Sequence, residues 1–282
     1  MYKLRELGFS VRLFERGSDV GGTWYWNRYP DIRCDVESYI YLPLIEEFGD
    51  MPPEKYSRGS VIFEHARKLG RELDLYSKTY FQTGVKEMRW HNERERWIVK
   101  TDLGDVFNAT FVSVGSGPIS RPKLPGIPGI ENFKGKTFHT SRWDYDYTGG
   151  DETGNLTGLK DKRVAIIGTG ATAVQCIPLT AQSAKELFVV QRTPAAVEAR
   201  NNRPTDADWW SAREPGWWKR RAENFVGFLV GVPQDEDLIQ DGGTTTWAKM
   251  SDAARDSVAQ GRSDKLSVAQ RVDIEKMSSI RA

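Results

Sequence analysis

Cysteine and histidine are both scarce in this sequence, and their scarcity excludes several kinds of site. The 282 residues include only two cysteines, Cys34 and Cys176, too few for a disulfide framework or a thiolate metal cluster. We therefore expect two unpaired thiols in a reducing compartment. The three histidines, His65, His91 and His139, lack metal-ligand spacing, so no metal site is predicted. His65 and His91 are expected at the surface.

Long apolar runs and a surplus of one charge are also missing. The longest apolar run, residues 225–232, is far below the roughly 20 residues of a membrane helix. The first residues carry charges where a signal peptide is apolar, so a cytoplasmic protein with no membrane partner is predicted. Lys and Arg total 40 against 39 Asp and Glu, a net charge of +1. That balance gives no electrostatic basis for a nucleic-acid partner.

What is present is a chain of ordinary globular composition, long enough for about two domains. Its start predicts the second half of a β-α-β unit, with a helix over residues 2–7, a stop at Gly8 and a strand over residues 10–15. In dinucleotide-binding folds an acid at the end of this strand hydrogen-bonds a ribose hydroxyl. Glu15 has that place, and the glycine-rich turn of the unit would lie before Met1.

An aromatic, glycine-dense loop follows over residues 21–35, with neither a helical nor a strand period. Its tryptophans and tyrosines either line a ligand site or cover the edge of a core, because aromatic rings dominate both. Beyond the loop, residues 64–76 have helical spacing. Residues 85–90 and 95–100 flank a turn, residues 107–114 follow, and together they predict a small antiparallel element.

A complete strand-turn-helix-strand pattern comes later in the chain. A short apolar strand over residues 162–167 leads into a GxGxxA turn over residues 168–173. A helix over residues 172–183 then precedes a second strand over residues 186–191. A glycine-rich turn between a strand and a helix indicates a dinucleotide site.

The residues around this turn suit a dinucleotide for physical reasons. Gly168 allows the tight turn, Gly170 lets the backbone approach a pyrophosphate, and the small Ala173 lets helix and strand pack closely. Arg192 follows the second strand, where a site for NAD would carry an acid. A carboxylate would repel the 2′-phosphate of NADP, whereas a guanidinium pairs with it, so NADP(H) is favoured over NAD(H).

A more specific pattern lies between the two nucleotide units. The segment reads FxGxxxHxxxWD, and its defining residues are Phe133, Gly135, His139, Trp143 and Asp144. This segment resembles the fingerprint of the Baeyer–Villiger monooxygenases, with every defining position present.

The aromatic loop resembles a second signature of that family. The residues in register are Gly22, Trp24, Tyr29, Pro30 and Asp35. One position departs, because Asp31 stands where the family usually has Gly or Met. An acid thus occupies a place where a small or flexible residue is usual.

The resemblance runs along the whole chain. The segment from Arg192 to Gly231 is most similar to the branch that acts on large cyclic and terpenoid ketones. Family members carry the FAD pyrophosphate turn before the position of Met1, and a catalytic Arg with much of the substrate pocket after the position of Ala282. The chain is therefore expected to be an internal part of such a monooxygenase.

The fold class that follows is α/β, with two Rossmann-like dinucleotide-binding domains, the FAD one incomplete. A small antiparallel β element and a helical C-terminal segment complete it. The predicted domains are an incomplete FAD-binding domain over residues 1–140, an NADP-binding Rossmann unit over 141–200, and a helical segment of the NADP and substrate region over 201–282.

The resemblance implies an FAD- and NADPH-dependent monooxygenase. NADPH reduces FAD, the reduced flavin activates O₂, and one oxygen atom is inserted next to a ketone carbonyl to give an ester or lactone. FAD would contact Glu15, Thr23, Trp24, Tyr25, Trp26, Asp35, Val36 and Tyr41. NADP(H) would contact Arg33, Cys34, Asp35, Thr169, Gly170, Ala171, Thr172, Ala173, Val174, Gln175, Arg192 and Thr193.

Two residues have further roles in the resembling family. Asp35 would orient the catalytic Arg, whose charge stabilises an anion during the reaction. His139, with the rest of the fingerprint, would belong to the linker between the nucleotide domains and act in conformational gating.

Three other functions stay open. The chain could be a noncatalytic NADP-binding module, a truncated pseudoenzyme, or a flavin monooxygenase that oxidises nitrogen or sulfur. Trp143 and Asp144 disfavour the last of these, because such relatives usually diverge there.

Overall fold

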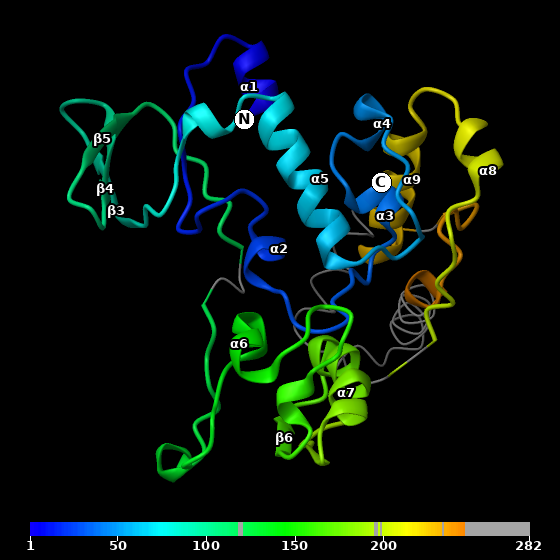
Figure 1. Ribbon diagram of the computed structural model, residues 1–282. Coiled ribbons are helices and arrows are strands. Elements are labelled where there is room, and N and C mark those ends of the chain that lie inside the picture. The colour runs from blue at the N-terminus through cyan, green and yellow to red at the C-terminus, as the bar shows by residue number, and fades with distance from the viewer. Residues whose placement is uncertain (118–120, 195–196, 198, 233, 246–282) are drawn as a thin grey trace, which may run out of the picture. The chain divides into compact units, whose positions relative to one another are not determined.

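The computed structural model describes residues 1–117, 121–194, 197, 199–232 and 234–245, and the chain folds as two units (Figure 1). The first unit comprises Met1–Arg33 and Arg58–Ala195, and the second comprises Cys34–Ser57 and Ala196–Ala282. Each unit is thus built from two separate stretches of sequence. The linear domain boundaries at residues 140 and 200 stay predictions.

The dinucleotide pattern of the first unit forms two parallel strands joined by a helix. β6 (Arg163–Ile167) pairs with β7 (Glu186–Val190), and α7 (Ala171–Ser183) connects them. Parallel strands need such a crossover connection, and a helix supplies it. The predicted strand-turn-helix-strand order is confirmed, with every boundary within one residue.

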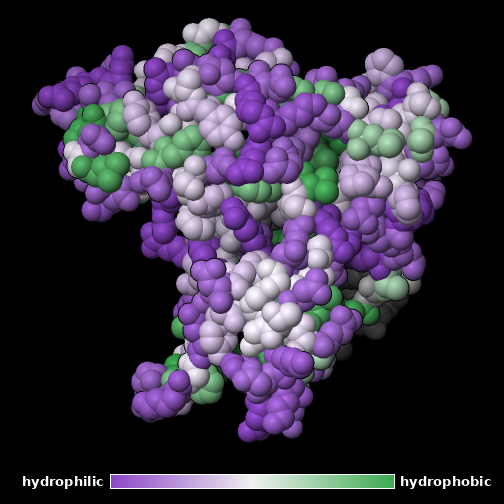
Figure 2. Space-filling view, in the orientation of Figure 1, coloured by the Kyte–Doolittle hydropathy of each residue, from purple (hydrophilic) through white to green (hydrophobic). Residues whose placement is uncertain are grey.

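A three-stranded antiparallel sheet also belongs to the first unit. β3 (Val85–His91) pairs with β4 (Arg96–Thr101), which pairs with β5 (Val106–Ala109). Hydrophobic side chains, green in Figure 2, lie over the sheet, and Val85 and Val106 are exposed. The small antiparallel element is therefore confirmed.

The third strand of this sheet is shorter than predicted. Its pairing ends where Ala109 meets Trp97, because β4 begins only one residue before Trp97. Residues 110–114 pair with no strand in the part of the chain that the structure describes, and Phe111 and Val114 are exposed. The prediction of a strand to residue 114 was wrong for this reason.

The start of the chain forms α1 (Tyr2–Glu6) and the two-residue strand β1 (Leu13–Phe14). β1 pairs in parallel with β2 (Thr79–Tyr80), and the rings of Phe14 and Tyr80 stack 5.3 Å apart. The predicted strand over residues 10–15 is shorter in the structure because its partner β2 has only two residues.

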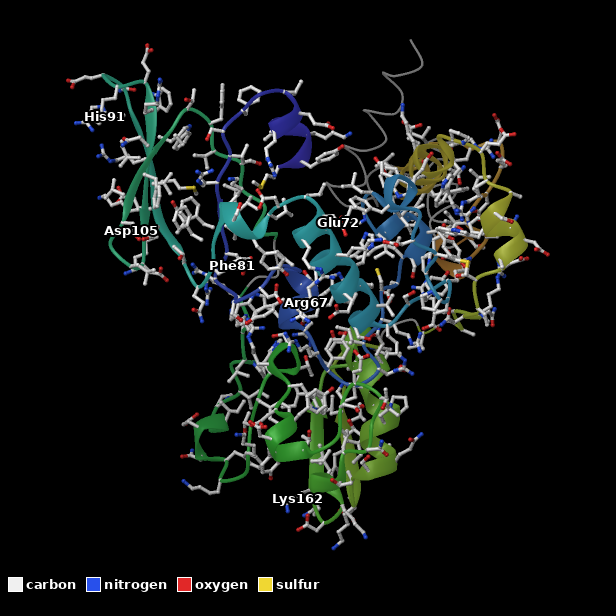
Figure 3. The ribbon with its side chains drawn as sticks, turned by 45° about the horizontal axis from the view of Figure 1, so that its top comes forward. Arg67, Glu72, Phe81, His91, Asp105 and Lys162 are labelled. Carbon is white, nitrogen blue, oxygen red and sulfur yellow. The ribbon has the colours of Figure 1, made fainter. Side chains whose placement is uncertain are left out.

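The long helix of the first unit is α5 (Gly59–Glu72), on which Figure 3 labels Arg67 and Glu72. Its buried side chains Ile62, His65 and Leu69 recur at the spacing of one helix face. The expectation that His65 lies at the surface was wrong, because that spacing turns it inward, where it is only 7% exposed.

The other elements of the first unit are single turns. They are α2 (Thr23–Trp26), η1 (Tyr76–Lys78), η2 (Ile130–Asn132), η3 (Thr140–Arg142), α6 (Tyr145–Thr148) and η4 (Thr157–Leu159). One of them, α2, falls in the aromatic loop that has no periodic pattern.

The second unit is helical in its described residues. It contains α3 (Ser38–Tyr41), α4 (Ile45–Phe48), α8 (Ala207–Ser211) and α9 (Trp217–Leu229), and α9 packs on α3 and α4. The predicted helical character after residue 203 is confirmed for α8 and α9. Residues 246–282 of that prediction lie outside the described residues.

Several tryptophans of the second unit pack against one another and against neighbouring side chains. Trp209, Trp210 and Trp217 make edge contacts with one another, and the Tyr39 ring lies 4.8 Å from Trp209. The guanidinium of Arg213 lies 3.1 Å from the Trp210 ring centroid and 4.2 Å from that of Trp217. Packing therefore accounts for these tryptophans.

Candidate dinucleotide-binding site

The turn between β6 and α7 has the backbone geometry of an anion site. Gly168 has φ +107°, a left-handed conformation that favours glycine, and its N–H donates to Val190 O at 2.8 Å. Gly170 is the N-cap of the 13-residue helix α7. The Cβ positions of both glycines have no neighbouring atom within 4 Å. A phosphate can therefore approach the N–H groups at the start of α7.

The residues after β7 lie beside this turn. Ile167 pairs with Val190 at the carboxyl ends of the two strands. Gln191 Nε2 then donates to Thr169 Oγ1 at 2.8 Å. Arg192 and Thr193 follow directly and are exposed. A cation and a hydroxyl thus stand next to the turn, open to a ligand.

The other turn residues divide between exposed, half-buried and buried positions. Ala171 is exposed at the start of α7, and Thr172 and Val174 are half-buried. Ala173 is only 7% exposed and belongs to a core cluster with Ile166 of β6. A small residue at this position allows the close approach of helix and strand.

Gln175 joins α7 to the aromatic loop. Its Oε1 accepts from the Tyr29 hydroxyl at 3.2 Å and from Arg33 N at 2.9 Å. Its Nε2 donates to Arg33 O at 3.2 Å. The side chain thus holds both main-chain groups of Arg33 and brings this predicted NADP(H) residue one turn along α7 from the glycines.

One hydrophobic cluster joins the same parts. Tyr29 and Ile32 from the aromatic loop are buried with Cys176 of α7, and Trp24 and Trp143 pack against the cluster. Trp143 comes from the fingerprint, so both family signatures pack on the dinucleotide unit. Tyr29 is thus part of the core, and Trp24 packs against it.

Asp31, which stands where the family usually has Gly or Met, adopts an unusual backbone conformation. Asp31 has φ +58°, the left-handed region that glycine adopts freely and that Asp tolerates better than most residues. Its N–H donates to Glu152 O at 2.8 Å. Asp31 therefore forms a left-handed bend at the position where the family usually has Gly or Met.

Two predicted FAD residues meet at Gly17. Glu15 Oε1 accepts from Gly17 N at 2.6 Å, and a Cβ on Gly17 would lie 2.6 Å from the Tyr25 ring. Ser18 fixes that ring through its Oγ, 2.8 Å from the Tyr25 hydroxyl. This hydrogen bond lowers the pKa of Tyr25. The end of β1 is thus joined to the helix α2 that Thr23 begins.

A cleft of about 550 Å³ lies between α2 and the fingerprint. Tyr25 and Trp26 line one part, and Phe138, Trp143 and Asp144 line another. The guanidinium of Arg142 stacks 4.0 Å from the Trp26 ring centroid. Aromatic faces edged by cations are suited to a planar, anionic ligand.

The polar fingerprint residues are engaged in local structure. His139 Nδ1 accepts from Ser141 N at 3.1 Å at the start of η3. Asp144 Oδ1 accepts from Tyr147 N at 3.1 Å, and Lys136 Nζ lies 2.6 Å from the Asp144 carboxylate. The hydrogen bond from Lys136 lowers the pKa of Asp144. Phe133 is exposed, and its ring lies against Gly135.

Four predicted cofactor residues belong to the second unit. Cys34 is buried, and desolvation raises the pKa of its thiol to about 12, which disfavours the thiolate. Val36 N donates to Cys34 Sγ at 3.4 Å. Asp35 and Tyr41 are exposed. Cys34 and Cys176 are both unpaired, as expected.

A buried ionic cluster next to Asp35 was not predicted from the sequence. Glu37 is fully buried and accepts from Arg221 through Nε and through Nη2, the latter at 2.9 Å. Lys55 Nζ lies 3.9 Å from Glu37 and donates to Ile239 O at 2.7 Å. These residues are far apart in sequence and have no motif spacing, so only the fold identifies them.

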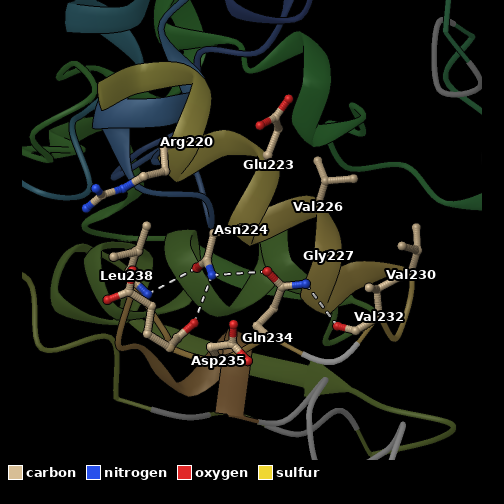
Figure 4. A pocket seen from close by; sticks show the side chains of 11 residues that line it. Arg220, Glu223, Asn224, Val226, Gly227, Val230, Val232, Gln234, Asp235 and Leu238 are labelled. Carbon is tan, nitrogen blue, oxygen red and sulfur yellow. Dashed lines mark hydrogen bonds between the residues drawn. The ribbon is translucent and has the colours of Figure 1, made fainter. Parts of the chain in front are cut away.

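A second hollow, of about 530 Å³, lies along α9 (Figure 4). Asn224 donates to Gln234 Oε1 at 3.3 Å and to Glu236 O at 2.8 Å, and it accepts from Leu238 N at 3.1 Å. Its amide thus fixes the returning segment, which is a structural role.

The described part of the chain lacks two features, a cluster of metal-ligating side chains and a helix that could span a membrane. Residues 1–117, 121–194, 197, 199–232 and 234–245 contain no group of three or more His, Cys, Asp or Glu side chains placed to hold a metal ion. Among the same residues, no helix has the length and apolar character needed to cross a membrane.

Comparison with known proteins identifies related sequences. The model of the flavin-binding monooxygenase-like family matches residues 5–206. Pentalenolactone D synthase of Streptomyces arenae is 52% identical over 274 residues, which are 96% of this chain and 46% of that protein. Baeyer-Villiger monooxygenase ATR8 of Stachybotrys chlorohalonatus is 51% identical over 272 residues, 96% of this chain and 44% of that protein. The chain spans less than half the length of these relatives.

Solved structures of monooxygenases are also similar to this chain. Polycyclic ketone monooxygenase from Thermothelomyces thermophila superposes with a TM-score of 0.79 at 40% identity, covering 86% of this chain and 42% of that one. The complex of OTEMO with FAD and NADP gives a TM-score of 0.69 at 33% identity, with 81% and 42% covered. The α/β fold predicted from the sequence is thereby confirmed.

Proposed function

The chain belongs to the flavin-binding monooxygenase-like family, and from this premise we propose that it is the part of a Baeyer–Villiger monooxygenase that binds NADP(H) and contacts FAD. The proposed reaction inserts one oxygen atom of O₂ next to a ketone carbonyl and gives an ester or lactone. The observation that carries the proposal is the joint at Gln175, where the family's second signature is hydrogen-bonded to the dinucleotide helix.

The residues around α7 fit NADP(H). The open glycine turn would hold the pyrophosphate on the N–H groups of Gly170 and Ala171. Arg192 and Thr193, exposed beside the turn, would bind the 2′-phosphate. Cys34 and Asp35 are proposed NADP(H) contacts only through the family resemblance.

The residues around Gly17 and the aromatic cleft fit FAD. One carboxylate oxygen of Glu15 accepts from Gly17 N, and the other oxygen can accept a hydrogen bond from a ribose hydroxyl. Tyr25 and Trp26 offer aromatic faces to the same ligand. When bound, FAD would supply the redox and oxygen chemistry that no side chain can provide.

In this scheme the chain's own residues bind the cofactors and hold the groups around them in position. Gln175 fixes the backbone of Arg33, and Trp143 anchors the fingerprint to the core beside α7. The exposed carboxylate of Asp35 would orient the cationic side chain that the resemblance assigns to it. Preorganised charges of this kind contribute strongly to catalysis because they need no rearrangement during the reaction.

We propose a cyclic or terpenoid ketone as the substrate. Support comes from the names of two similar proteins, pentalenolactone D synthase and polycyclic ketone monooxygenase. A cytoplasmic location stays a prediction from the sequence.

The test is a reaction of the whole monooxygenase that contains this segment with FAD, NADPH, a polycyclic ketone and ¹⁸O₂. We expect a retained flavin absorption band after desalting, and an ester or lactone that carries one ¹⁸O atom. An N-oxide or sulfoxide from matching substrates, with no ester, would favour the alternative oxygenase. Binding of NADPH without flavin would contradict the monooxygenase and favour a noncatalytic NADP-binding module.

The coenzyme preference gives a separate prediction. Arg192→Ala is expected to weaken NADPH binding by about tenfold, equivalent to about 1.4 kcal/mol, and to leave NADH binding nearly unchanged, because NADH lacks the 2′-phosphate. Calorimetric titration with both coenzymes measures this. Arg163→Ala, an exposed arginine at the opposite end of β6, is the control for net charge. Equal weakening of NADPH and NADH would contradict the 2′-phosphate role.

A further inference from the structure

Two arginines of the first unit share one carboxylate near the dinucleotide turn. Asp31 Oδ1 lies 3.2 Å from Arg33 Nε and 3.2 Å from Arg58 Nη1. Arg33 and Arg58 also form an isolated antiparallel bridge, so their backbones are adjacent. The Asp31 carboxylate therefore faces two positive charges, and its neighbour Glu152 directs its own carboxylate to the Ser60 hydroxyl.

The main chain of Arg33 is bound to α7 about one turn from the proposed pyrophosphate site. Gln175 holds both main-chain groups of Arg33. Gln175 follows Ala171 by four residues on α7, about one helical turn or 5.4 Å along the axis. An extended arginine side chain spans a similar length. The Arg33 guanidinium can therefore turn either toward Asp31 or toward an anion at the start of α7.

The charge of Asp31 is separable from its backbone role. The left-handed conformation at this position, with φ +58°, is also accessible to Asn and Gly. The bend itself thus needs no carboxylate. What the carboxylate adds is the ion pair with Arg33 and Arg58.

We propose that Asp31 sets the affinity for NADP(H) by holding the Arg33 guanidinium away from the coenzyme pyrophosphate. This inference rests on the proposed NADP(H) site. Binding of the coenzyme must compete with an ion pair that is partly exposed, with 23% of the Arg33 side chain and 35% of Asp31 accessible. Pairs of this kind change an equilibrium constant by a few-fold. Asp31 is an affinity-determining residue in this scheme and does not itself touch the coenzyme.

The test compares the whole chain with its Asp31→Asn variant by calorimetric titration with NADPH and with NADH. We expect both coenzymes to bind about three- to fivefold more tightly to Asp31→Asn, because both carry the pyrophosphate. The affinity of the variant should also fall more steeply with salt, since Arg33 then pairs with the ligand. Asp31→Gly gives the same comparison if the Asn variant does not fold.

Asp161→Asn is the matched control. It makes the same change in net charge at an exposed aspartate before β6, beside Lys162, which Figure 3 labels. That end of the five-residue strand is opposite to the glycine turn. We expect Asp161→Asn to leave both affinities unchanged.

The possible results separate the two proposals. Unchanged or weaker binding by both Asp31 variants overturns the role of Asp31 while the NADP(H) site stands. Tighter binding of NADPH alone overturns the assignment to the pyrophosphate. If neither the parent chain nor the variants bind a coenzyme, the proposed NADP(H) site itself is wrong.

Discussion

Glu37→Gln is expected to lower the free energy of unfolding by about 3–5 kcal/mol, because it removes the carboxylate from a buried ionic cluster. Glu37 is fully buried between Arg221 and Lys55. Glutamine keeps the shape of the side chain but not its charge. Arg221 and Lys55 would then keep their charges without the buried anion that they face. Losing one partner of a buried pair costs far more than losing a surface ion pair.

Burial and the opposite charges of neighbouring side chains act against each other in this cluster. Burial raises the pKa of Glu37, against the hydrogen bonds and charge of Arg221. Burial likewise lowers the pKa of Lys55, against the charge of Glu37. Both groups thus depend on their partners to stay ionised, and the segment that follows Asp35 is fixed through them.

Urea unfolding followed by tryptophan fluorescence measures the loss. With a denaturant slope of about 1–3 kcal/mol per M, the midpoint should fall by at least about 1 M. Glu47→Gln, at an exposed glutamate of α4, is the matched control and should change stability by less than about 0.5 kcal/mol. A loss for Glu37→Gln no larger than that of the control would contradict the role of the cluster.

A double variant distinguishes charge from packing. Glu37→Met and Arg221→Met should each be strongly destabilising, because each leaves an opposite charge buried. Together they should cost clearly less than the sum of the single losses, since neither charge then remains. Simple additivity would show that the two side chains do not act as a pair.

Gln175→Met is expected to lower the free energy of unfolding by about 2–4 kcal/mol, the sum of three hydrogen bonds lost without a cavity. Methionine has nearly the volume of glutamine but cannot replace the amide. The Tyr29 hydroxyl and both main-chain groups of Arg33 would lose the partner that Gln175 provides. The aromatic loop would then lose its polar attachment to α7.

The same change should also weaken NADPH. We expect about a tenfold rise in the dissociation constant, equivalent to about 1.4 kcal/mol, because Arg33 is no longer held one turn from the glycines. Gln182→Met changes an exposed glutamine of the same helix and should affect neither quantity. Unfolding and titration experiments on the two variants give the comparison. If the Gln175→Met protein is as stable as Gln182→Met and its NADPH affinity is unchanged, the Gln175 hydrogen bonds do not have the proposed role in attaching the aromatic loop to α7.

Local sequence patterns predicted the dinucleotide unit well. β6, the glycine turn, α7 and β7 depend on short-range rules, namely apolar strand runs, a left-handed glycine and a helix start. The fingerprint and the second signature were also readable in the sequence, because their residues lie close together along the chain. Such features are fixed by neighbours within a few residues.

Features that depend on contacts with other segments of the chain were predicted wrongly or were not predicted at all. The strands at residues 10–15 and 107–114 were predicted too long, because their partners β2 and β4 limit the pairing. His65 was expected to be exposed, although the face of α5 on which it lies is buried. The cluster around Glu37 had no signal, since Arg221 is 184 residues away.

The family, the α/β fold class and the position of the glycine turn could be predicted from the amino-acid sequence, since each is encoded by residues close together in the chain. The contacts of Gln175 with Arg33, of Asp31 with two arginines and of Glu37 with its counter-charges could be identified only in the folded protein. Hydrogen bonds and ion pairs act over a few ångströms in space, whatever the separation along the chain. Their partners become identifiable once the fold has brought distant segments together.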